Sequence, residues 1–254
     1  MAPKIAKRFE GKVAVVTGAA QGMGKQASLD FAAEGAKVVI TDIAADLLEQ
    51  TQKEIRENGG ECLSAVCDIA SRPQVDRLIQ KTMDTYGRVD ILVNNAGLLT
   101  TGTIEETSDE LIDKTLDINV KGVLYTIRAV TPIMKKQRYG RMVNVASITG
   151  KRGDNTTVIV YGASKGAVIT ITRSAARQLG PFGITVNAIA PHAVMTKMMS
   201  YWDEEKKRQI ADKIPVKRLG TAEDMSNLMR FLASDESSFI TGETVNINGG
   251  YYMD

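Results

Sequence analysis

Short apolar runs alternate along the chain with longer stretches in which apolar residues recur every three or four positions. The runs cover residues 13–17, 37–41, 62–66, 90–94, 141–145, 184–189 and 244–248, and they are rich in β-branched side chains. Strands that are apolar on both faces are typical of a parallel sheet covered by helices on each side. The alternation therefore predicts an α/β fold: a doubly wound parallel sheet of about seven strands with helices on both faces.

Helical periodicity covers residues 24–36, 47–59, 75–87 and 161–180, and the second and third stretches end near a glycine stop. Two helix starts have capping-box spacing, Ser71 with Gln74 and Thr107 with Glu110, and Pro73 suits the first turn after Ser71.

The chain shows no internal repeat, low-complexity tract or linker-like change in composition. We therefore expect one domain over residues 1–254. The segment 193–214 interrupts the last strand–helix unit with a long excursion. Such an insertion at the carboxyl end of a parallel strand predicts a lid over a substrate site.

Residues 17–24, TGAAQGMG, connect the first predicted strand to the helix after it. Gly18, Gly22 and Gly24 allow a tight turn and let a phosphate approach the helix N-terminus, where amide hydrogens and the helix dipole favour negative charge. Asp42 ends the second strand, where a carboxylate can hold both hydroxyls of an adenosine ribose. The combination predicts a Rossmann-type dinucleotide site. Asp42 could also cap the following helix, and the two roles are compatible.

Asp42 also bears on the choice of cofactor. A 2′-phosphate about 4 Å from this carboxylate, at an effective dielectric near 20, would be repelled by about 4 kcal/mol per unit charge. No arginine lies in the glycine turn, and Lys25 is its only nearby cation. We therefore predict NAD rather than NADP.

The sequence YGASK places Tyr161 and Lys165 four residues apart, on one face of a predicted helix. A phenol with an ordinary pKa near 10 is a poor base at neutral pH, but a neighbouring ammonium favours the phenolate. Ser147 follows the fifth strand and could hydrogen-bond the same substrate oxygen. This pattern indicates proton transfer at an alcohol or carbonyl oxygen.

Together these features resemble the short-chain dehydrogenase/reductase family, in its small single-domain branch, over nearly the whole chain. The resemblance rests on Thr17-Gly18-xxx-Gly22-x-Gly24, Asp68 after the third strand, Asn94-Asn95-Ala96-Gly97 after the fourth, Asn119, Ser147 and Tyr161-xxx-Lys165.

The resemblance implies a role for each matching position. Tyr161 is the expected general acid/base, Lys165 lowers its pKa and binds the nicotinamide ribose, Ser147 orients the substrate oxygen, and Asn119 holds a proton-relaying water. The residues expected to bind the cofactor are Gly18, Gln21, Gly22, Met23, Gly24, Asp42, Ile43, Asp68, Ile69, Asn95, Ala96, Gly97, Tyr161, Lys165, Pro191, Val194 and Thr196. Structural alternatives stay open: Asn119 at a helix kink, Asn94 and Asn95 bracing the sheet, and Ser147 as a strand-end cap.

The chain has a single histidine, His192, which follows Pro191 where the family usually has glycine. Because Tyr161 already fills the acid/base role, we expect His192 to be structural or to face the substrate. The tentative substrate residues are Ser147, Asp154, His192, Met198 and Trp202. Methionine and aromatic residues around position 200 favour an apolar substrate, whereas the charges at 151–154 favour a polar or anionic one, so the substrate stays open.

Composition excludes several other classes of function. The chain has 32 basic and 30 acidic residues, a net charge of +2 and no basic block, so we expect no nucleic-acid partner. Cys62 and Cys67 lack metal-site spacing and fit a reducing compartment. The first residues lack the apolar core of a secretory signal, and no run of about twenty apolar residues could span a membrane. We expect a cytoplasmic protein without a metal.

The sequence thus predicts an NAD-dependent oxidoreductase that acts on a secondary alcohol or ketone, such as a sugar or polyol, a hydroxysteroid, a cyclic alcohol or a hydroxy acid. A 3-oxoacyl-[acyl-carrier-protein] reductase is the alternative enzyme, and a catalytically silent dinucleotide-binding protein is the alternative from another class. The resemblance also implies a homotetramer.

Overall fold

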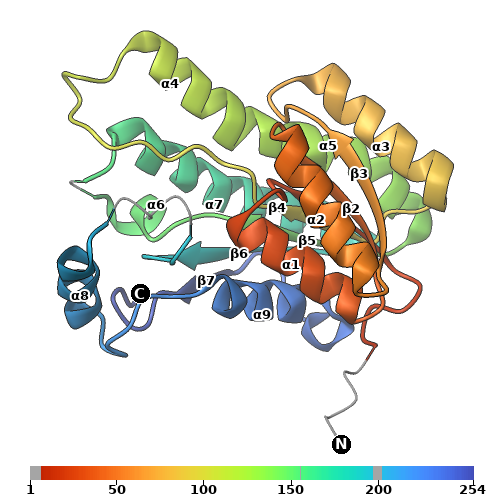
Figure 1. Ribbon diagram of the computed structural model, residues 1–254. Coiled ribbons are helices and arrows are strands. Elements are labelled where there is room, and N and C mark those ends of the chain that lie inside the picture. Colours follow the sequence, from red (N-terminus) through yellow and green to blue (C-terminus); the bar gives the residue numbers. More distant parts are fainter. Residues whose placement is uncertain (1–6, 155, 197–201) are drawn as a thin grey trace, which may run out of the picture.

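The computed structural model describes residues 7–154, 156–196 and 202–254, and its centre is one parallel sheet (Figure 1). The strands are β1 (Val13–Thr17), β2 (Lys37–Asp42), β3 (Glu61–Val66), β4 (Ile91–Asn94), β5 (Gly140–Val145), β6 (Ile184–Pro191) and β7 (Thr244–Ile247). Their order is β3-β2-β1-β4-β5-β6-β7. The predicted doubly wound sheet is confirmed, and each strand boundary lies within two residues of its expected position.

Helices cover both faces of this sheet (Figure 1). One face carries α1 (Gly22–Ala33), α2 (Ala45–Glu57) and α9 (Ala222–Ala233), and the other carries α3 (Arg72–Tyr86), α5 (Gly122–Gln137) and α7 (Ile159–Leu179). In β1, Ala14 and Val16 belong to the first apolar core while Val13 and Val15 belong to the second, as the alternation of side chains along a strand requires. No helix in the described ranges has the length and apolarity needed to cross a bilayer.

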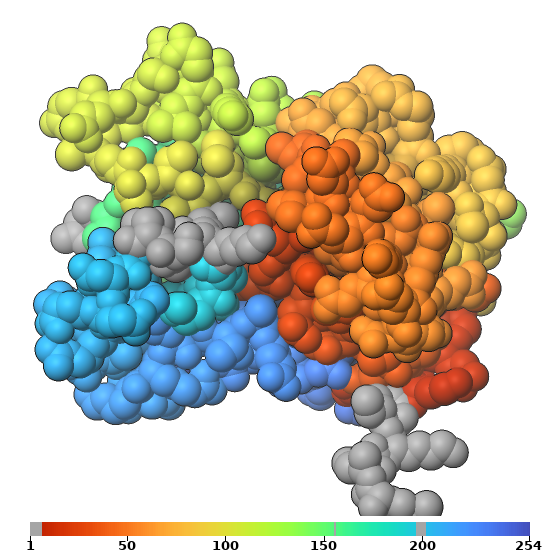
Figure 2. Space-filling view, viewed as in Figure 1, coloured from red at the N-terminus to blue at the C-terminus, as the bar shows by residue number. Residues whose placement is uncertain are grey.

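Three shorter helices follow the strands that end near the site: α4 (Asp109–Leu116) after β4, α6 (Thr149–Arg152) after β5 and α8 (Glu204–Lys213) after β6. In the space-filling view the α4 segment (yellow-green) and the α8 segment (light blue) lie on the same side of the molecule, one above the other (Figure 2). These segments surround the carboxyl edge of the sheet, where the site is built.

The two predicted capping boxes are wrong in detail. Ser71 is the N-cap of α3 as expected, but its side chain makes no capping bond, and Gln74 Oε1 accepts the backbone N–H of Asp68 (2.9 Å) rather than that of Ser71. At α4 the cap is Ser108, whose hydroxyl accepts a helix N–H, while the Thr107 hydroxyl donates to a carbonyl before the helix. Neighbouring hydroxyls compete for such bonds, so spacing alone did not identify the cap.

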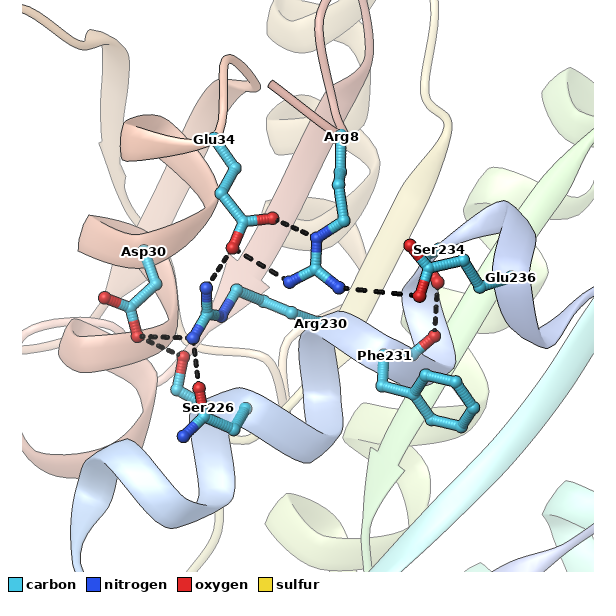
Figure 3. A network of polar contacts seen from close by, with 9 residues as sticks. Arg8, Asp30, Glu34, Ser226, Arg230, Phe231, Ser234 and Glu236 are labelled. Carbon is cyan, nitrogen blue, oxygen red and sulfur yellow. Dashed lines mark hydrogen bonds and ion pairs between the residues drawn. The ribbon is translucent and has the colours of Figure 1, made fainter. Parts of the chain in front are cut away.

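A buried ion network ties the start of the chain to α1 and α9 (Figure 3). The Glu34 carboxylate accepts bonds from Arg8 at 2.5 and 2.9 Å and also from Arg230 of α9. Ser226 donates to Asp30 at 2.6 Å, one turn earlier on α1. The Glu34 side chain is only 5% exposed, so removal of its carboxylate would leave both guanidinium groups without their main partner.

Candidate active site

The strand order reverses between β1 and β4, which are neighbours in the sheet but not consecutive in the chain. A crevice forms outside the carboxyl ends of the strands at such a point. There the Thr17 hydroxyl accepts the N–H groups of Asn95 and Ala96, each at 3.1 Å. The Asn95 side-chain amide donates to the carbonyls of Thr17 (3.0 Å) and Gly18 (2.9 Å). These bonds hold the glycine turn against the end of β4.

The glycine turn is packed too closely for side chains. A Cβ on Gly18 would lie 2.7 Å from the Cα of Ala96, and the backbone of Gly18 has φ +64°. A Cβ on Gly24 would collide with the carbonyl oxygen of Gly18 and with the Asn95 amide. The local geometry therefore requires glycine at positions 18 and 24. Without side chains here, the start of α1 is free to face an anionic group.

Asp42 joins the glycine turn to the start of α2. One carboxylate oxygen accepts the N–H of Ala20 and the other accepts the N–H of Ala44, each at 3.1 Å. Ala44 is the residue that caps α2, so Asp42 takes part in the helix start while it also lines the cleft. The N-cap of α2 is therefore Ala44 rather than Asp42, and a contact between Asp42 and an adenosine ribose stays a prediction.

A cleft of about 400 Å³ runs along these strand ends. It is lined by every residue expected to bind the cofactor except Gly24, which supports the turn from behind. Lining residues that sequence reasoning missed are Thr41, Cys67, Leu98, Leu99, Lys114, Ile118, Val145 and Ala146. Most of these residues adjoin a strand end, and that position could have identified them. Lys114 and Ile118 instead come from α4 and the turn after it, and nothing in the neighbouring sequence marks them as lining residues.

Tyr161 of α7 and Ser147 after β5 meet in the cleft. Tyr161 is 7% exposed, and burial raises its pKa to about 12, although a hydrogen bond with Ser147 acts in the opposite direction. The negative charge of Asp154 raises the pKa further. Tyr161 is therefore a neutral phenol at physiological pH, the form that can give a proton to a carbonyl oxygen.

Lys165 is buried one turn further along α7. Its Nζ donates to the carbonyl of Val145 (2.7 Å) and lies 5.9 Å from the centre of the Tyr161 ring, and burial lowers its pKa to about 8. A Cβ on Gly97 would lie 3.3 Å from this Nζ. Burial therefore has the largest effect on the pKa of Tyr161, and the lowering of that pKa by Lys165 stays a prediction.

Asn119 lies in a π-helical turn, η1 (Asp117–Lys121), between α4 and α5. Its Oδ1 accepts the N–H of Leu98 (2.7 Å), and its Nδ2 donates to the Leu98 carbonyl (2.9 Å) and to the Ser164 hydroxyl (3.0 Å). Helix irregularities of this kind occur frequently at functional sites. Asn119 thus lies at a helix irregularity, but its side chain bonds Leu98 and Ser164 rather than the backbone of that helix, and it links α7 to the segment after β4.

Asn94 braces the centre of the sheet, as expected. Its amide donates to Asn144 of β5 (2.9 Å) and its oxygen accepts the Thr126 hydroxyl of α5 (2.7 Å). Asn144 in turn donates to Thr172 of α7 (2.9 Å). This buried chain of hydrogen bonds fixes the strand ends that carry the site.

His192 lines the cleft directly after β6. Its ring stacks on Tyr251, with centroids 3.9 Å apart and planes 15° apart. Burial lowers its pKa to about 4, and the charge of Arg152 acts in the same direction while that of Asp154 opposes it. The imidazole is therefore neutral at physiological pH and is poorly suited to proton transfer there.

Asp154, Met198 and Trp202 are the remaining tentative substrate residues. Asp154 and Trp202 are absent from the described lining of the cleft, and Asp154 instead accepts bonds from the backbone and hydroxyl of Thr156. Met198 lies outside the described residues, as does part of the expected lid. Within the described ranges, no three His, Cys, Asp or Glu side chains gather in a way that could hold a metal ion.

A glycine turn at the switch point of a parallel sheet, with a serine after a neighbouring strand and a tyrosine and a lysine on the helix packed beside it, defines a dinucleotide-dependent oxidoreductase. A family model described as enoyl-(acyl carrier protein) reductase matches residues 18–252. The chain belongs to the short-chain dehydrogenase/reductase family.

Known relatives match over nearly their whole length. The chain is 41% identical to the (2S)-[(R)-hydroxy(phenyl)methyl]succinyl-CoA dehydrogenase subunit BbsD of Thauera aromatica, covering 95% of this chain and 97% of that protein. It is 39% identical to the 3-oxoacyl-[acyl-carrier-protein] reductase FabG of Thermotoga maritima, covering 96% and 98%. A 3-oxoacyl-[acyl-carrier protein] reductase from Brucella melitensis with bound NAD superimposes with a TM-score of 0.91 at 32% identity, covering 99% and 95%.

Proposed function

We propose that this oxidoreductase transfers a hydride between NAD(H) and a secondary alcohol or ketone, with Tyr161 as the general acid/base. The proposal is supported by the contact of Ser147 with Tyr161 in the cleft and by buried Lys165 one turn further along α7. The nicotinamide would supply or accept the hydride. Ser147 would hold the substrate oxygen, and Tyr161 Oη would give it a proton during reduction or remove one during oxidation.

Lys165 would bind the nicotinamide ribose and would relay protons to and from Tyr161. Its lowered pKa, about 8, allows it to exchange a proton near physiological pH. Both ends of the Asn119 side-chain amide are engaged by Leu98 and Ser164. A water held at Asn119 would therefore bind its backbone carbonyl, and this water would connect Lys165 to solvent.

We propose NAD as the cofactor because the Asp42 carboxylate lies in the cleft at the end of β2. Its two hydrogen bonds fix it beside the glycine turn, where it would accept from the ribose hydroxyls and repel a 2′-phosphate. The Brucella melitensis neighbour, which has NAD bound, supports the same choice.

Reduction of a 3-oxoacyl group on an acyl carrier protein is the second candidate, favoured by the names of several relatives. Docking an acidic carrier needs unpaired cations near the cleft. Lys207 and Arg208 of α8 pair with Glu204 and Glu205, whereas Lys114 of α4 lines the cleft itself and offers a cation to such a carrier. Acetoacetyl-CoA, a thioester without the carrier, distinguishes the two: efficient reduction of it, with slow turnover of simple ketones, would favour the second candidate.

The test is a screen of secondary alcohols with NAD⁺, in which the absorbance of the reduced cofactor is followed. The panel contains a polyol, a hydroxysteroid, a cyclic alcohol and a hydroxy acid. Turnover of at least one class is expected. Binding of NADH without turnover of any alcohol, ketone or thioester would instead support the catalytically silent dinucleotide-binding protein.

We further propose a single-domain, cytoplasmic homotetramer that acts on a small molecule, with residues 193–214 as its substrate lid. The fully exposed Phe239 and the partly exposed Phe231 support burial of this surface against another copy. The free, buried thiols of Cys62 and Cys67 suit a reducing compartment. Light scattering of the purified protein tests the assembly, since a monomeric mass would contradict it.

A further inference from the structure

His192 stands where two cavities meet. It lines the cofactor cleft, and it also lines a second cavity of about 270 Å³ on the side of α9 and β7. The walls of the second cavity include the apolar side chains of Ile214, Val216, Met225 and Ile247. Its charged lining residues, Arg218 and Asp224, form a two-pronged ion pair at 2.5 and 2.9 Å. The cavity therefore offers mainly apolar contacts.

The imidazole is held in place from the C-terminal segment. Tyr251 stacks flat on it at 3.9 Å, and the Arg152 guanidinium lies 5.3 Å from the Tyr251 ring centre. The loop that carries Tyr251 is itself fixed, because Asn248 accepts the N–H of Gly250 and donates to the carbonyl of Tyr252, each at 2.9 Å. A ring stacked on an anchored aromatic residue loses rotamers that would let it swing aside.

We propose that His192, positioned by Tyr251, is a wall that separates the substrate end of the cleft from the second cavity and restricts the enzyme to compact substrates. The inference rests on the proposed function, because it assigns the substrate class of that same site. A ketone with a short side chain fits in front of the ring. The imidazole ring prevents a longer alkyl chain from entering the second cavity behind the ring.

Removal of the ring opens this space. In His192→Gly the two cavities are expected to join, and each methylene that enters apolar surroundings strengthens binding about fourfold. We expect the ratio of kcat/KM for octanone to that for butanone to rise at least about tenfold over the wild-type ratio. An unchanged ratio would overturn the proposal, and His192→Ala provides the same test if the glycine variant folds poorly.

Tyr251 offers a matched pair of variants for the positioning role. Tyr251→Phe keeps the stacked ring and should keep the wild-type chain-length ratio, whereas Tyr251→Leu removes the stack and should shift the ratio toward that of His192→Gly, chiefly through KM. Because His192 is the only histidine, its imidazole NMR signals can be followed alone. The pKa of His192 should be near 4 in the wild type and higher in Tyr251→Leu. An unchanged His192 pKa and an unchanged chain-length ratio in Tyr251→Leu would contradict the positioning role of Tyr251.

A binding measurement keeps this inference distinguishable from the proposed function. Affinities of the same ketones for NAD⁺-loaded protein are determined by ligand-observed NMR, which needs no turnover. A steeper dependence on chain length in His192→Gly than in the wild type supports the wall even if no ketone is reduced, in which case only the proposed function fails. Equal dependence in both proteins overturns the wall whether or not the ketones react.

Discussion

Replacement of Asp42 by asparagine should weaken the preference for NAD over NADP. The substitution removes one negative charge from the cleft and nearly keeps the side-chain shape. One oxygen remains to accept the N–H of Ala20 or Ala44, so one of the two present hydrogen bonds is retained. The change therefore acts mainly on charge and less on the fold of the glycine turn.

The size of the effect follows from the separation of the charges. A phosphate oxygen about 4 Å from the carboxylate is repelled by about 1 kcal/mol per unit charge at the dielectric of water and by about 4 kcal/mol at an effective dielectric of 20. Asp42 is only partly exposed, so its environment lies between these limits. A repulsion of about 2 kcal/mol corresponds to about a thirtyfold preference for NAD.

The assay compares kcat/KM for NADH and NADPH with one ketone in three proteins. The wild type should prefer NADH by at least about tenfold, and Asp42→Asn should reduce that preference to within about threefold of unity. Asp46→Asn is the matched control, because Asp46 is an exposed residue four positions further on, outside the described cleft lining. An equal preference in wild type and Asp42→Asn would refute the electrostatic argument.

Three other substitutions have defined outcomes. Glu34→Gln should lower the free energy of unfolding by about 3 kcal/mol, because it leaves the guanidinium groups of Arg8 and Arg230 without their buried counter-charge. A decrease below about 1 kcal/mol, measured by urea denaturation, would contradict this prediction. Asp154→Asn should move the midpoint of the pH–rate profile for alcohol oxidation to lower pH, because the Asp154 charge raises the pKa of Tyr161 and the reaction needs the phenolate. A midpoint that stays at the wild-type pH or rises would count against this effect of Asp154. Gly97→Ala should weaken NADH binding about tenfold in a fluorescence titration without a large change in Tm, since the new methyl would lie 3.3 Å from the Lys165 amine.

Much of the architecture was predictable because a parallel sheet repeats one physical pattern. The central strands β1, β2, β4, β5 and β6 are buried on both faces, so their positions were visible in the sequence, and the carboxyl ends of three of them placed Asp42, Asn95 and Ser147 at a common edge. The glycines of the turn were predictable for a related reason. At Gly18 and Gly24 the backbone of a neighbouring segment approaches too closely for any side chain.

Contacts between distant segments were not predictable in this way. Lys114 reaches the cleft from the α4 segment, and Tyr251 reaches His192 from the C-terminal loop, and neither position carries a local signal. The protonation state of Tyr161 also depends on burial, which spacing along a helix cannot reveal. The sequence therefore indicated which residues meet in the cleft better than it indicated the surroundings that set their pKa and the shape of the cleft.

Proton transfer by Tyr161 can be tested with the single substitution Tyr161→Phe. The variant keeps the ring and the packing of α7 and removes only the hydroxyl. Single-turnover reduction of a ketone that the wild type accepts should slow by about a thousandfold, while the dissociation constant of NADH, measured by fluorescence, stays within about threefold. A variant that binds NADH equally well and reduces the ketone within about tenfold of the wild-type rate would contradict the account.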